Sequence, residues 1–202
     1  MADPVRIYGL PLSQNVRKPL SVAHHLGIEV ENDPLRPNEE GVVAVNPCGR
    51  IPAMDDNGYL LGESNAIMIH LARKVPNNLY PADPKLCDRV NFFLFWDVAH
   101  WTPAYQPIQF ERVVKRAFDL GECDEAAVEA AMVKLTREAT FLNNYLEGRE
   151  WLVGDAPTLA DFAVGCGLTH AEGMDLPLRD YPNILAWNAR VKNLDGMKKT
   201  AI

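Results

Sequence analysis

The chain has 202 residues, which is enough for one domain or for two small ones. Hydrophobic residues make up 48% and charged residues 23%, a composition typical of a folded globular protein and not of a disordered one. Its 27 acidic and 20 basic residues give a formal net charge of −7, which argues against a nucleic-acid-binding protein because such a protein needs a basic face. No apolar run of about 18 residues occurs, so we expect no membrane-spanning segment and no membrane partner.

The first half of the chain alternates strand and helix patterns. Apolar alternation at residues 5–7 predicts a first strand, and apolar positions at helical spacing over 16–23 predict a helix that ends at Gly27. Residues 28–30 alternate like a second strand. This part therefore predicts a β-α-β unit.

A hairpin and a second helix follow. The segment up to Met54 predicts a third strand, Asp56-Asn57-Gly58 is a strong signal for a type I′ turn, and residues 59–61 predict the returning strand. Apolar residues over 66–71 predict a further helix. The order β-β-α completes a small sheet covered by helices.

The second half is dominated by helix patterns. Three prolines between residues 75 and 84 predict a linker over 77–85. Apolar residues over 128–146 recur at spacings of four and three, the pattern of an amphipathic helix. The run 92–96 is apolar on every side, which predicts either a central helix of a bundle or a subunit interface. Thr158-Leu-Ala-Asp161 predicts a capped helix start.

Three short segments of the first half carry residues suited to binding a charged ligand. Ser13 lies at a strand-to-helix turn, where a helix N-terminus favours an anion, although Ser is also an ordinary cap residue. A cis bond at Ile51-Pro52 would turn the Ile51 main chain outward toward a peptide-like ligand, whereas a trans bond would make an ordinary turn. Ser64 and Glu63 begin the next predicted helix and suit a carboxylate and an ammonium, or act only as a cap.

Together these segments resemble the cytosolic glutathione S-transferases, most closely the bacterial theta- and phi-like serine-type branch. The resemblance covers the whole chain and implies a thioredoxin-like α/β domain over 1–76, a linker over 77–85 and an all-α helical-bundle domain over 86–202. The matching motifs are Ser13-Gln-Asn, Arg50-Ile-Pro, Glu63-Ser-Asn-Ala-Ile, Trp151-Leu-Val-Gly-Asp and Thr158-Leu-Ala-Asp.

The resemblance implies an enzyme of detoxification that transfers glutathione, its cosubstrate, to an apolar electrophile without a tightly bound cofactor. Ser13 matches the catalytic serine, whose hydroxyl donates a hydrogen bond to the glutathione sulfur and stabilises the thiolate. Tyr8 is the alternative donor, because other classes carry a catalytic tyrosine near this position.

The glutathione-binding residues follow from the same resemblance. The Ile51 main chain pairs with the cysteinyl part, and the bond to Pro52 is expected to be cis. Ser64 binds the γ-glutamyl carboxylate and Glu63 the ammonium. The remaining contacts to the tripeptide are Gln14 and Arg50, the latter through the glycyl carboxylate.

The second domain is expected to contribute the electrophile pocket and dimer contacts. Aromatic residues there favour an apolar electrophile, although packing or dimer contacts account for them equally well. Asp97 is the candidate for an acidic residue that completes the site of the other subunit of a homodimer. The candidates for the electrophile pocket are Leu12, His100, Trp101 and Tyr105.

The four cysteines are widely spaced and form no C-x-x-C pair, so we expect free thiols and a cytoplasmic location. Cys48, close in sequence to the expected site, is either a redox-sensitive thiol or a small loop residue. None of the five histidines has metal-ligand spacing to another His or Cys, so we expect no metal site.

Two alternatives to a transferase remain open. One is a non-catalytic binding or scaffold protein on the same fold, because fold does not fix function. The other is a specialised glutathione-dependent dehalogenase, lyase, isomerase or peroxidase that uses the same thiolate. The presence of all three ligand-binding segments favours an enzyme over a scaffold.

Overall fold

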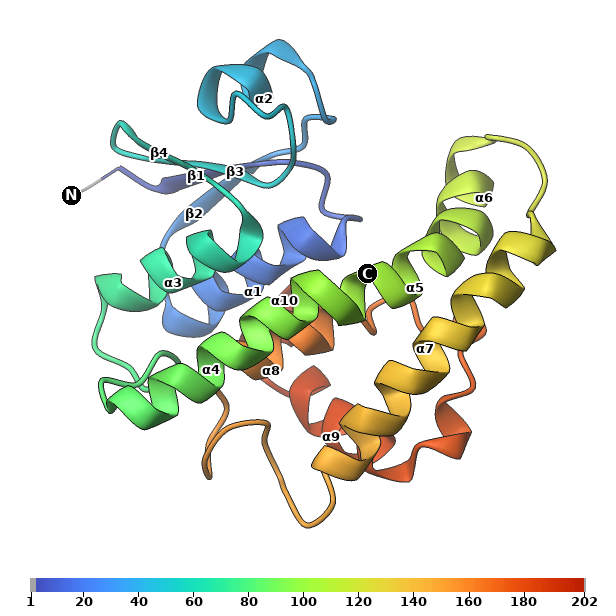
Figure 1. The fold of residues 1–202 in the computed structure, drawn as a ribbon. Helices are drawn as coiled ribbons and strands as arrows, with labels where there is room; N and C mark the ends of the chain where they lie inside the picture. Colours follow the sequence, from blue (N-terminus) through green and yellow to red (C-terminus); the bar gives the residue numbers. More distant parts are fainter. Residues whose placement is uncertain (1–2, 202) are drawn as a thin grey trace. The chain divides into compact units, whose positions relative to one another are not determined.

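The structure, a computed structural model, describes residues 3–201 and consists of two compact units (Figure 1). The first unit contains the chain up to Cys87 and the segment from Val191 onward, and the second runs from Asp88 to Arg190. The predicted second domain, residues 86–202, includes the segment from Val191 onward, which the structure groups with the first unit. The predicted domain boundaries at 76 and 86 stay predictions.

The C-terminal segment groups with the first unit because of a close helix contact. Helix α10 (Asp195–Lys199) packs on α1 (Gln14–Leu26). A Cβ atom at Gly196 would overlap the carbonyl oxygen of Ser21, so only glycine lets the two backbones approach this closely. No pattern in the sequence predicts this contact, because α1 and α10 lie far apart along the chain.

A four-stranded sheet with strand order β2-β1-β3-β4 forms the centre of the first unit. Strand β1 pairs parallel with β2 and antiparallel with β3, and β3 pairs antiparallel with β4. Helices α1 and α3 pack together, and the apolar side chains of the sheet and of these helices form the core. This is the expected thioredoxin-like α/β domain. Its elements are β1 (Val5–Tyr8), α1 (Gln14–Leu26), β2 (Val30–Asp33), α2 (Glu40–Val45), β3 (Ala53–Asp56), β4 (Tyr59–Gly62), α3 (Ser64–Lys74) and α10 (Asp195–Lys199).

Both turn signals of the first unit are confirmed, and one strand begins later than predicted. Asn57 and Gly58 have φ values of 54° and 86°, as the type I′ turn requires. Gly27 ends α1 at φ 67°. The next residue, Ile28, donates its N–H to Ala23 in the same helix cap, so β2 begins at Val30 and the predicted start at Ile28 is wrong.

Every regular element between residues 88 and 190 is helical, as predicted. The long helical segment in the green part of Figure 1 changes twice to π-helical turns. Among residues 3–201, no helix combines the length and the apolar character needed to cross a membrane. The elements are α4 (Pro84–Trp96), η1 (Asp97–Trp101), α5 (Thr102–Gln109), η2 (Phe110–Val114), α6 (Lys115–Phe118), α7 (Glu125–Tyr145), α8 (Leu159–Cys166), η3 (Leu178–Asp180) and α9 (Pro182–Lys192).

The apolar run on α4 is only partly buried. Phe93, Leu94 and Trp96 are buried, whereas Phe92 and Phe95 are 51% and 72% exposed. The run is therefore not a central helix buried on all sides, and its exposed side is what the interface alternative predicts.

The predicted helix start is also present: α8 begins at 159, and the carboxylate of Asp161 accepts the Thr158 N–H at 2.9 Å.

Candidate functional site

One small pocket of about 90 Å³ in the first unit gathers most of the predicted binding residues. Its walls come from three segments that are distant in sequence: the start of α1, the loop before β3, and the turn from β4 into α3. These are the three segments that the sequence singled out. The lining residues are Asn15, Arg50, Ile51, Pro52, Glu63 and Ser64.

Ser13 is the N-cap residue of α1 but does not use its side chain as a cap. Its backbone is extended, with φ −73° and ψ 122°, and its carbonyl accepts the Arg17 N–H at 2.9 Å. The hydroxyl makes no capping hydrogen bond and the residue is partly exposed. The local alternative, a serine that only caps its helix, therefore does not describe this side chain.

The two residues after Ser13 differ in accessibility. Gln14 is only 4% exposed and does not line the pocket, so the structure does not bring this predicted contact to the others. Asn15 is partly exposed and lines the pocket, although the sequence assigned it no role. Its place in the Ser13-Gln-Asn motif could have indicated this role, because successive side chains at a helix start point to different sides.

The loop before β3 presents main-chain groups to the pocket. The Ile51–Pro52 bond is cis, as predicted. Among the described residues 3–201, neither the N–H nor the carbonyl of Ile51 has a hydrogen-bond partner in the chain. Arg50 is exposed at the pocket wall. The loop thus offers a donor, an acceptor and a cation to a ligand.

The turn from β4 into α3 is conformationally strained. Glu63 has φ 64° and ψ 114°, a conformation that a residue with a side chain rarely adopts. Such strain costs about 1–3 kcal/mol and is concentrated at functional sites. Ser64, the first residue of α3, is 6% exposed and lines the pocket beside the amides of the first helical turn. Helix N-termini favour anions, so this wall suits a carboxylate.

Tyr8 lies outside this pocket. It follows Arg6 by two residues on β1, so both side chains project from the same face of the sheet. Arg6 hydrogen-bonds Tyr8 and lies 3.5 Å from Glu31, and these interactions raise the pKa of Arg6. The Tyr8 hydroxyl is thus engaged by a cation on the outer face.

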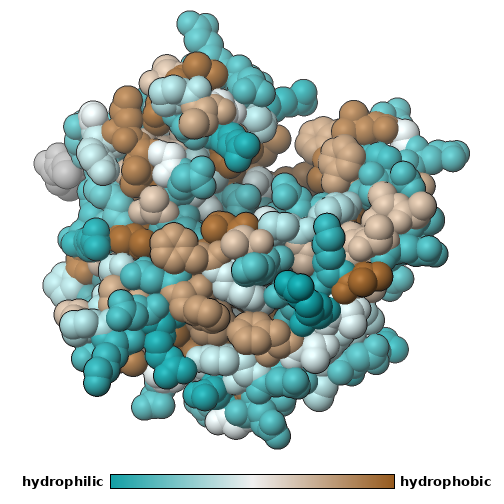
Figure 2. Space-filling view, in the orientation of Figure 1, coloured by the Kyte–Doolittle hydropathy of each residue, from teal (hydrophilic) through white to brown (hydrophobic). Residues whose placement is uncertain are grey.

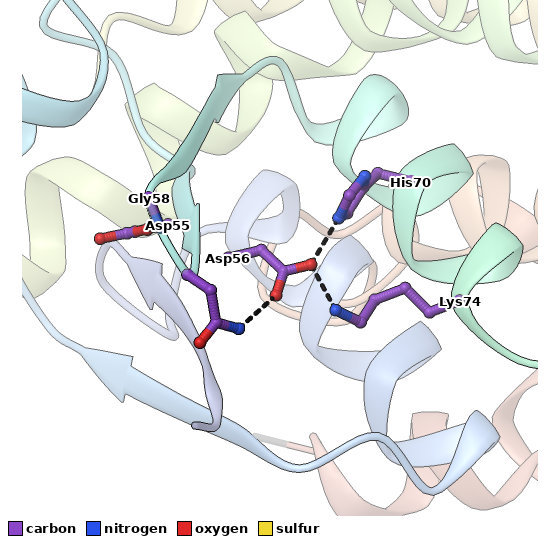
Figure 3. Close-up of polar contacts among 6 residues, drawn as sticks. Asp55, Asp56, Gly58, His70 and Lys74 are labelled. Atoms are coloured by element: carbon purple, nitrogen blue, oxygen red, sulfur yellow. Dashed lines mark hydrogen bonds and ion pairs between the residues drawn. The ribbon is translucent and has the colours of Figure 1, made fainter. Parts of the chain in front are cut away.

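An ion-pair cluster around the buried carboxylate of Asp56 fastens α3 to the β3–β4 hairpin (Figure 3). The carboxylate of Asp56 lies 2.7 Å from His70 Nε2 and also accepts hydrogen bonds from Lys74 and Asn57. Burial alone would raise the pKa of Asp56, but the hydrogen bonds from Lys74, His70 and Asn57 outweigh it and lower the pKa to about 2. The cluster therefore fixes the helix whose first residue, Ser64, lines the pocket.

Two larger hollows carry charged linings but lack the predicted site residues. In the second unit, a cavity of about 550 Å³ is lined by pairs such as Lys115–Glu111 at 2.6 Å and Arg112–Glu125 at 3.2 Å. In the first unit, a cavity of about 250 Å³ is lined by Arg17, whose guanidinium donates to Met197 O at 2.9 Å. In both hollows these side chains already serve the fold.

Two of the four residues predicted for the electrophile pocket are buried, and the other two are accessible. Trp101 and Tyr105 are fully buried; the Trp101 indole donates to Val164 O at 3.2 Å and stacks on Trp96. The packing alternative accounts for both residues in this structure, and their contact with an electrophile stays a prediction. His100 on the second unit is exposed, and Leu12 on the first unit is partly exposed.

Asp97, the candidate for a residue that completes the site of a second subunit, is fully buried in the single chain. Its side chain accepts a hydrogen bond from Thr102 at 3.1 Å, so local contacts already occupy it. Its role toward a second chain stays a prediction.

Cys48 is exposed, and all four cysteines, which lie within the described residues, are free thiols. In residues 3–201, no cluster of His, Cys, Asp and Glu side chains has the geometry to hold a metal ion.

Comparison with known protein families matches both units. The model of the glutathione S-transferase N-terminal domain matches residues 7–79, and that of the glutathione S-transferase C-terminal domain matches residues 98–195. The chain belongs to the glutathione S-transferase family. This membership confirms the predictions of the thioredoxin-like and helical fold, of a glutathione transferase, and of glutathione as its cosubstrate.

Individual relatives agree with this assignment. Glutathione S-transferase D7 of Drosophila melanogaster is 28% identical over 192 residues, which cover 90% of this chain and 81% of the relative. The structure of a glutathione S-transferase from Xanthobacter autotrophicus is 29% identical, with a TM-score of 0.84, and the match covers 95% of this chain and 94% of that one. A delta-class glutathione transferase of Nilaparvata lugens is 29% identical, with a TM-score of 0.81, covering 98% and 92%.

Proposed function

We propose that this glutathione transferase is of the serine type, from the bacterial theta- and phi-like branch, and that it binds glutathione in the pocket of the first unit. The observation that carries the proposal is the pocket lining, in which five predicted glutathione contacts meet. Ser13 lies two residues before the pocket residue Asn15, and its hydroxyl makes no capping hydrogen bond. Both observations support Ser13 as the catalytic serine.

The charges of glutathione match the groups at the pocket. The γ-glutamyl carboxylate binds Ser64 and the N-terminal amides of α3, where the helix dipole favours an anion. Glu63 receives the γ-glutamyl ammonium, and Arg50 the glycyl carboxylate. The unpaired main-chain groups of Ile51 bind the cysteinyl part in the manner of an added strand.

Ser13 then activates the thiol by donating its hydroxyl proton in a hydrogen bond to the sulfur. A free thiol has a pKa of about 8.5, and lowering it by about two units requires about 2.7 kcal/mol of differential stabilisation. A hydrogen bond to a charged group supplies about 1.5–3 kcal/mol. The N-terminus of α1 adds about 0.3–1 kcal/mol, so the two together suffice.

The choice of Ser13 over Tyr8 rests on where the two hydroxyls lie. Tyr8 is engaged with Arg6 on the outer face of the sheet, whereas Ser13 has no capping bond to give up. When the bound thiol has a pKa below the ambient pH, its proton passes to water, so neither hydroxyl needs a general base beside it. The thiolate attacks the electrophile, forming a carbon–sulfur bond as the leaving group departs with the electron pair.

The electrophile is apolar in this proposal. Leu12, partly exposed on the first unit, and His100, exposed on the second unit, each stay a predicted contact. The end of the long helical segment and the turn that follows it also present exposed apolar side chains. They offer a surface for an apolar substrate that the buried Trp101 and Tyr105 lack. They are Phe110, Phe118 and Leu120, which are 44%, 40% and 54% exposed.

A homodimer is the assembly that the exposed apolar side of α4 supports. Figure 2 shows apolar surface over the middle of this face, where α4 lies in Figure 1. Phe92 and Phe95 are exposed there, and the Phe92 ring contacts Phe141 of α7 at 6.5 Å between centroids. Exposed aromatic groups of this size mark protein interfaces more often than isolated surface residues do.

We place the enzyme in the cytoplasm, where free thiols such as its four cysteines persist.

Calorimetric titration with glutathione and an assay of thioether formation with an activated aryl chloride test this proposal. We expect binding that weakens in Ser64→Ala and turnover that falls in Ser13→Ala. Binding with no turnover on aryl chlorides, peroxides, haloalkanes or isomerisable double bonds would favour a non-catalytic protein. Turnover on only one of the last three classes would point to a specialised peroxidase, dehalogenase or isomerase. The absence of glutathione binding would refute the proposal.

A further inference from the structure

Asn46, which lines no part of the pocket, is tied to the loop that does. It follows α2, is 7% exposed, and donates its backbone N–H to Val42 O at 2.7 Å. Its carbonyl accepts the Gly49 N–H at 2.8 Å. The side-chain Oδ1 accepts the Cys48 N–H at 3.2 Å, and Nδ2 donates to Arg50 O at 2.9 Å. Three of the four polar groups of the residue thus hold the segment 46–50, and the fourth, its backbone N–H, ties that segment to α2.

The bond to Arg50 O fixes the orientation of the next amide. Because the peptide unit is planar and trans, the Arg50 carbonyl and the Ile51 N–H point in opposite directions. Asn46 holds the carbonyl on its own side, so the Ile51 N–H is directed away from it. That N–H is one of the unpaired main-chain groups at the pocket wall.

Asn46 also contacts the second wall. A Cβ atom on Gly62 would lie 2.9 Å from Asn46 Nδ2 and 3.0 Å from its Cγ, closer than side chains pack. The backbone of Gly62 is not in the left-handed region, so close approach to Asn46, and not its conformation, requires glycine here. Gly62 directly precedes Glu63 and Ser64, which line the pocket.

We propose that Asn46 is a positioning residue that sets the Arg50–Ile51 wall and the Glu63–Ser64 wall of the glutathione pocket relative to each other. It acts through a hydrogen bond on the first wall and a packing contact on the second. The assignment of the ligand rests on the proposed function, whereas the mechanical role of Asn46 does not. Removing its side chain loosens both walls at once.

The test compares Asn46→Ala with Asn77→Ala. The Asn77 side chain makes three hydrogen bonds to backbone groups of the same unit, at Ala72 O, Val75 O and the Leu79 N–H, against two for Asn46, but it lies beyond the C-terminus of α3. We expect Asn46→Ala to raise KM for glutathione about tenfold, the effect of one lost hydrogen bond, with kcat changed less than about twofold. Asn77→Ala should leave KM unchanged. Equal KM in wild type and Asn46→Ala would overturn the proposal.

Two further variants keep the test informative if Asn46→Ala folds poorly. Asn46→Asp retains the size and the acceptor for Cys48 but loses the donor to Arg50, so it should raise KM in the same direction. Gly62→Ala should raise KM in the wild-type background and in the Asn46→Asp background, where the side chain keeps its size, but should add little in the Asn46→Ala background, because that change already removes the contact. Strictly additive effects of Gly62→Ala and Asn46→Ala would contradict a shared contact.

Hydrogen exchange separates this proposal from the identity of the ligand. Without any glutathione, Asn46→Ala should speed amide exchange in segments 47–52 and 62–66 together, whereas Asn77→Ala should leave both unchanged. If wild type does not bind glutathione but this paired change occurs, the proposed function fails and the positioning role stands. If exchange rises in neither segment or in only one, the positioning role is wrong whatever the ligand.

Discussion

Asp161 and Trp187 are joined by a hydrogen bond of 2.8 Å between the carboxylate Oδ1 and the indole Nε1, inside the second unit. The same carboxylate accepts the Leu152 N–H at 2.9 Å and the N–H and hydroxyl of Thr158 at 2.9 and 3.2 Å. Burial raises the pKa of Asp161, and the hydrogen bonds oppose that rise. One side chain therefore starts α8, holds the preceding loop and anchors α9.

This arrangement predicts a large loss of stability in Asp161→Ala. The change leaves several buried donors without an acceptor, so the free energy of unfolding should fall by about 3 kcal/mol or more. Trp187→Phe, which removes one donor and part of a ring, should cost less than Asp161→Ala. Urea unfolding measures both, with the exposed Asp155→Ala as the control. A loss in Asp161→Ala no larger than in Asp155→Ala would contradict this role.

The Asp56 cluster predicts acid sensitivity of the first unit. Because the pKa of Asp56 is lowered from 3.8 to about 2, its contribution is fully present above pH 3.8 and is lost as the pH falls toward 2. The contribution is about 2 kcal/mol at neutral pH. Asp56→Asn should remove most of it and flatten the decline in stability over this range, as followed by urea unfolding at a series of pH values.

The neighbouring residue supplies the control for this prediction. Asp55 accepts the Gly58 N–H at 2.7 Å in the same turn but forms none of the bonds to His70 and Lys74. Asp55→Asn keeps an acceptor and should change stability by less than about 0.5 kcal/mol. If both variants lose stability equally, the turn and not the ion-pair cluster is responsible.

The proposed homodimer predicts that a charge on the exposed side of α4 separates the subunits. Phe95→Glu and Phe92→Glu would bury an unpaired carboxylate in the interface, so light scattering at micromolar concentration should show monomers. Val133→Glu, at a position on α7 that is 74% exposed, serves as the control and should remain dimeric. A monomeric wild-type protein would remove the basis of the proposal.

Local patterns in the sequence predicted the parts of the fold that depend on near neighbours. The turn at Asn57-Gly58 and the cap at Gly27 need particular backbone conformations, which few residue types adopt. The strand after Gly27 was placed too early because the cap itself uses Ile28. Helix α2 was missed, since six residues around a glycine carry little periodic signal.

Contacts between distant segments were beyond such patterns. The capping pair at 158 and 161 was predicted, but its link to Trp187 joins residues 26 positions apart. The packing of Gly196 on Ser21 is of the same kind. Trp101 and Tyr105 were assigned to a pocket because aromatic residues suit both surfaces and cores, and only burial separates the two uses.

The candidate site shows the same division. Motifs placed Arg50, Ile51 and Ser64 at a ligand, and the pocket gathers them. The motif could not distinguish the buried Gln14 from the accessible Asn15. Asn46 gave no sign of its role, because that role consists of contacts to two walls that only the folded chain brings together.

The proposed catalysis depends most on the Ser13 hydroxyl as the donor that stabilises the glutathione thiolate. The direct measurement is an ultraviolet difference titration of enzyme-bound glutathione in wild type, Ser13→Ala and Tyr8→Phe. We predict a bound-thiol pKa about two units below the ordinary value of about 8.5 in wild type and in Tyr8→Phe, and a return to about 8.5 in Ser13→Ala. A lowered pKa that persists in Ser13→Ala, or one that is lost in Tyr8→Phe, would contradict it.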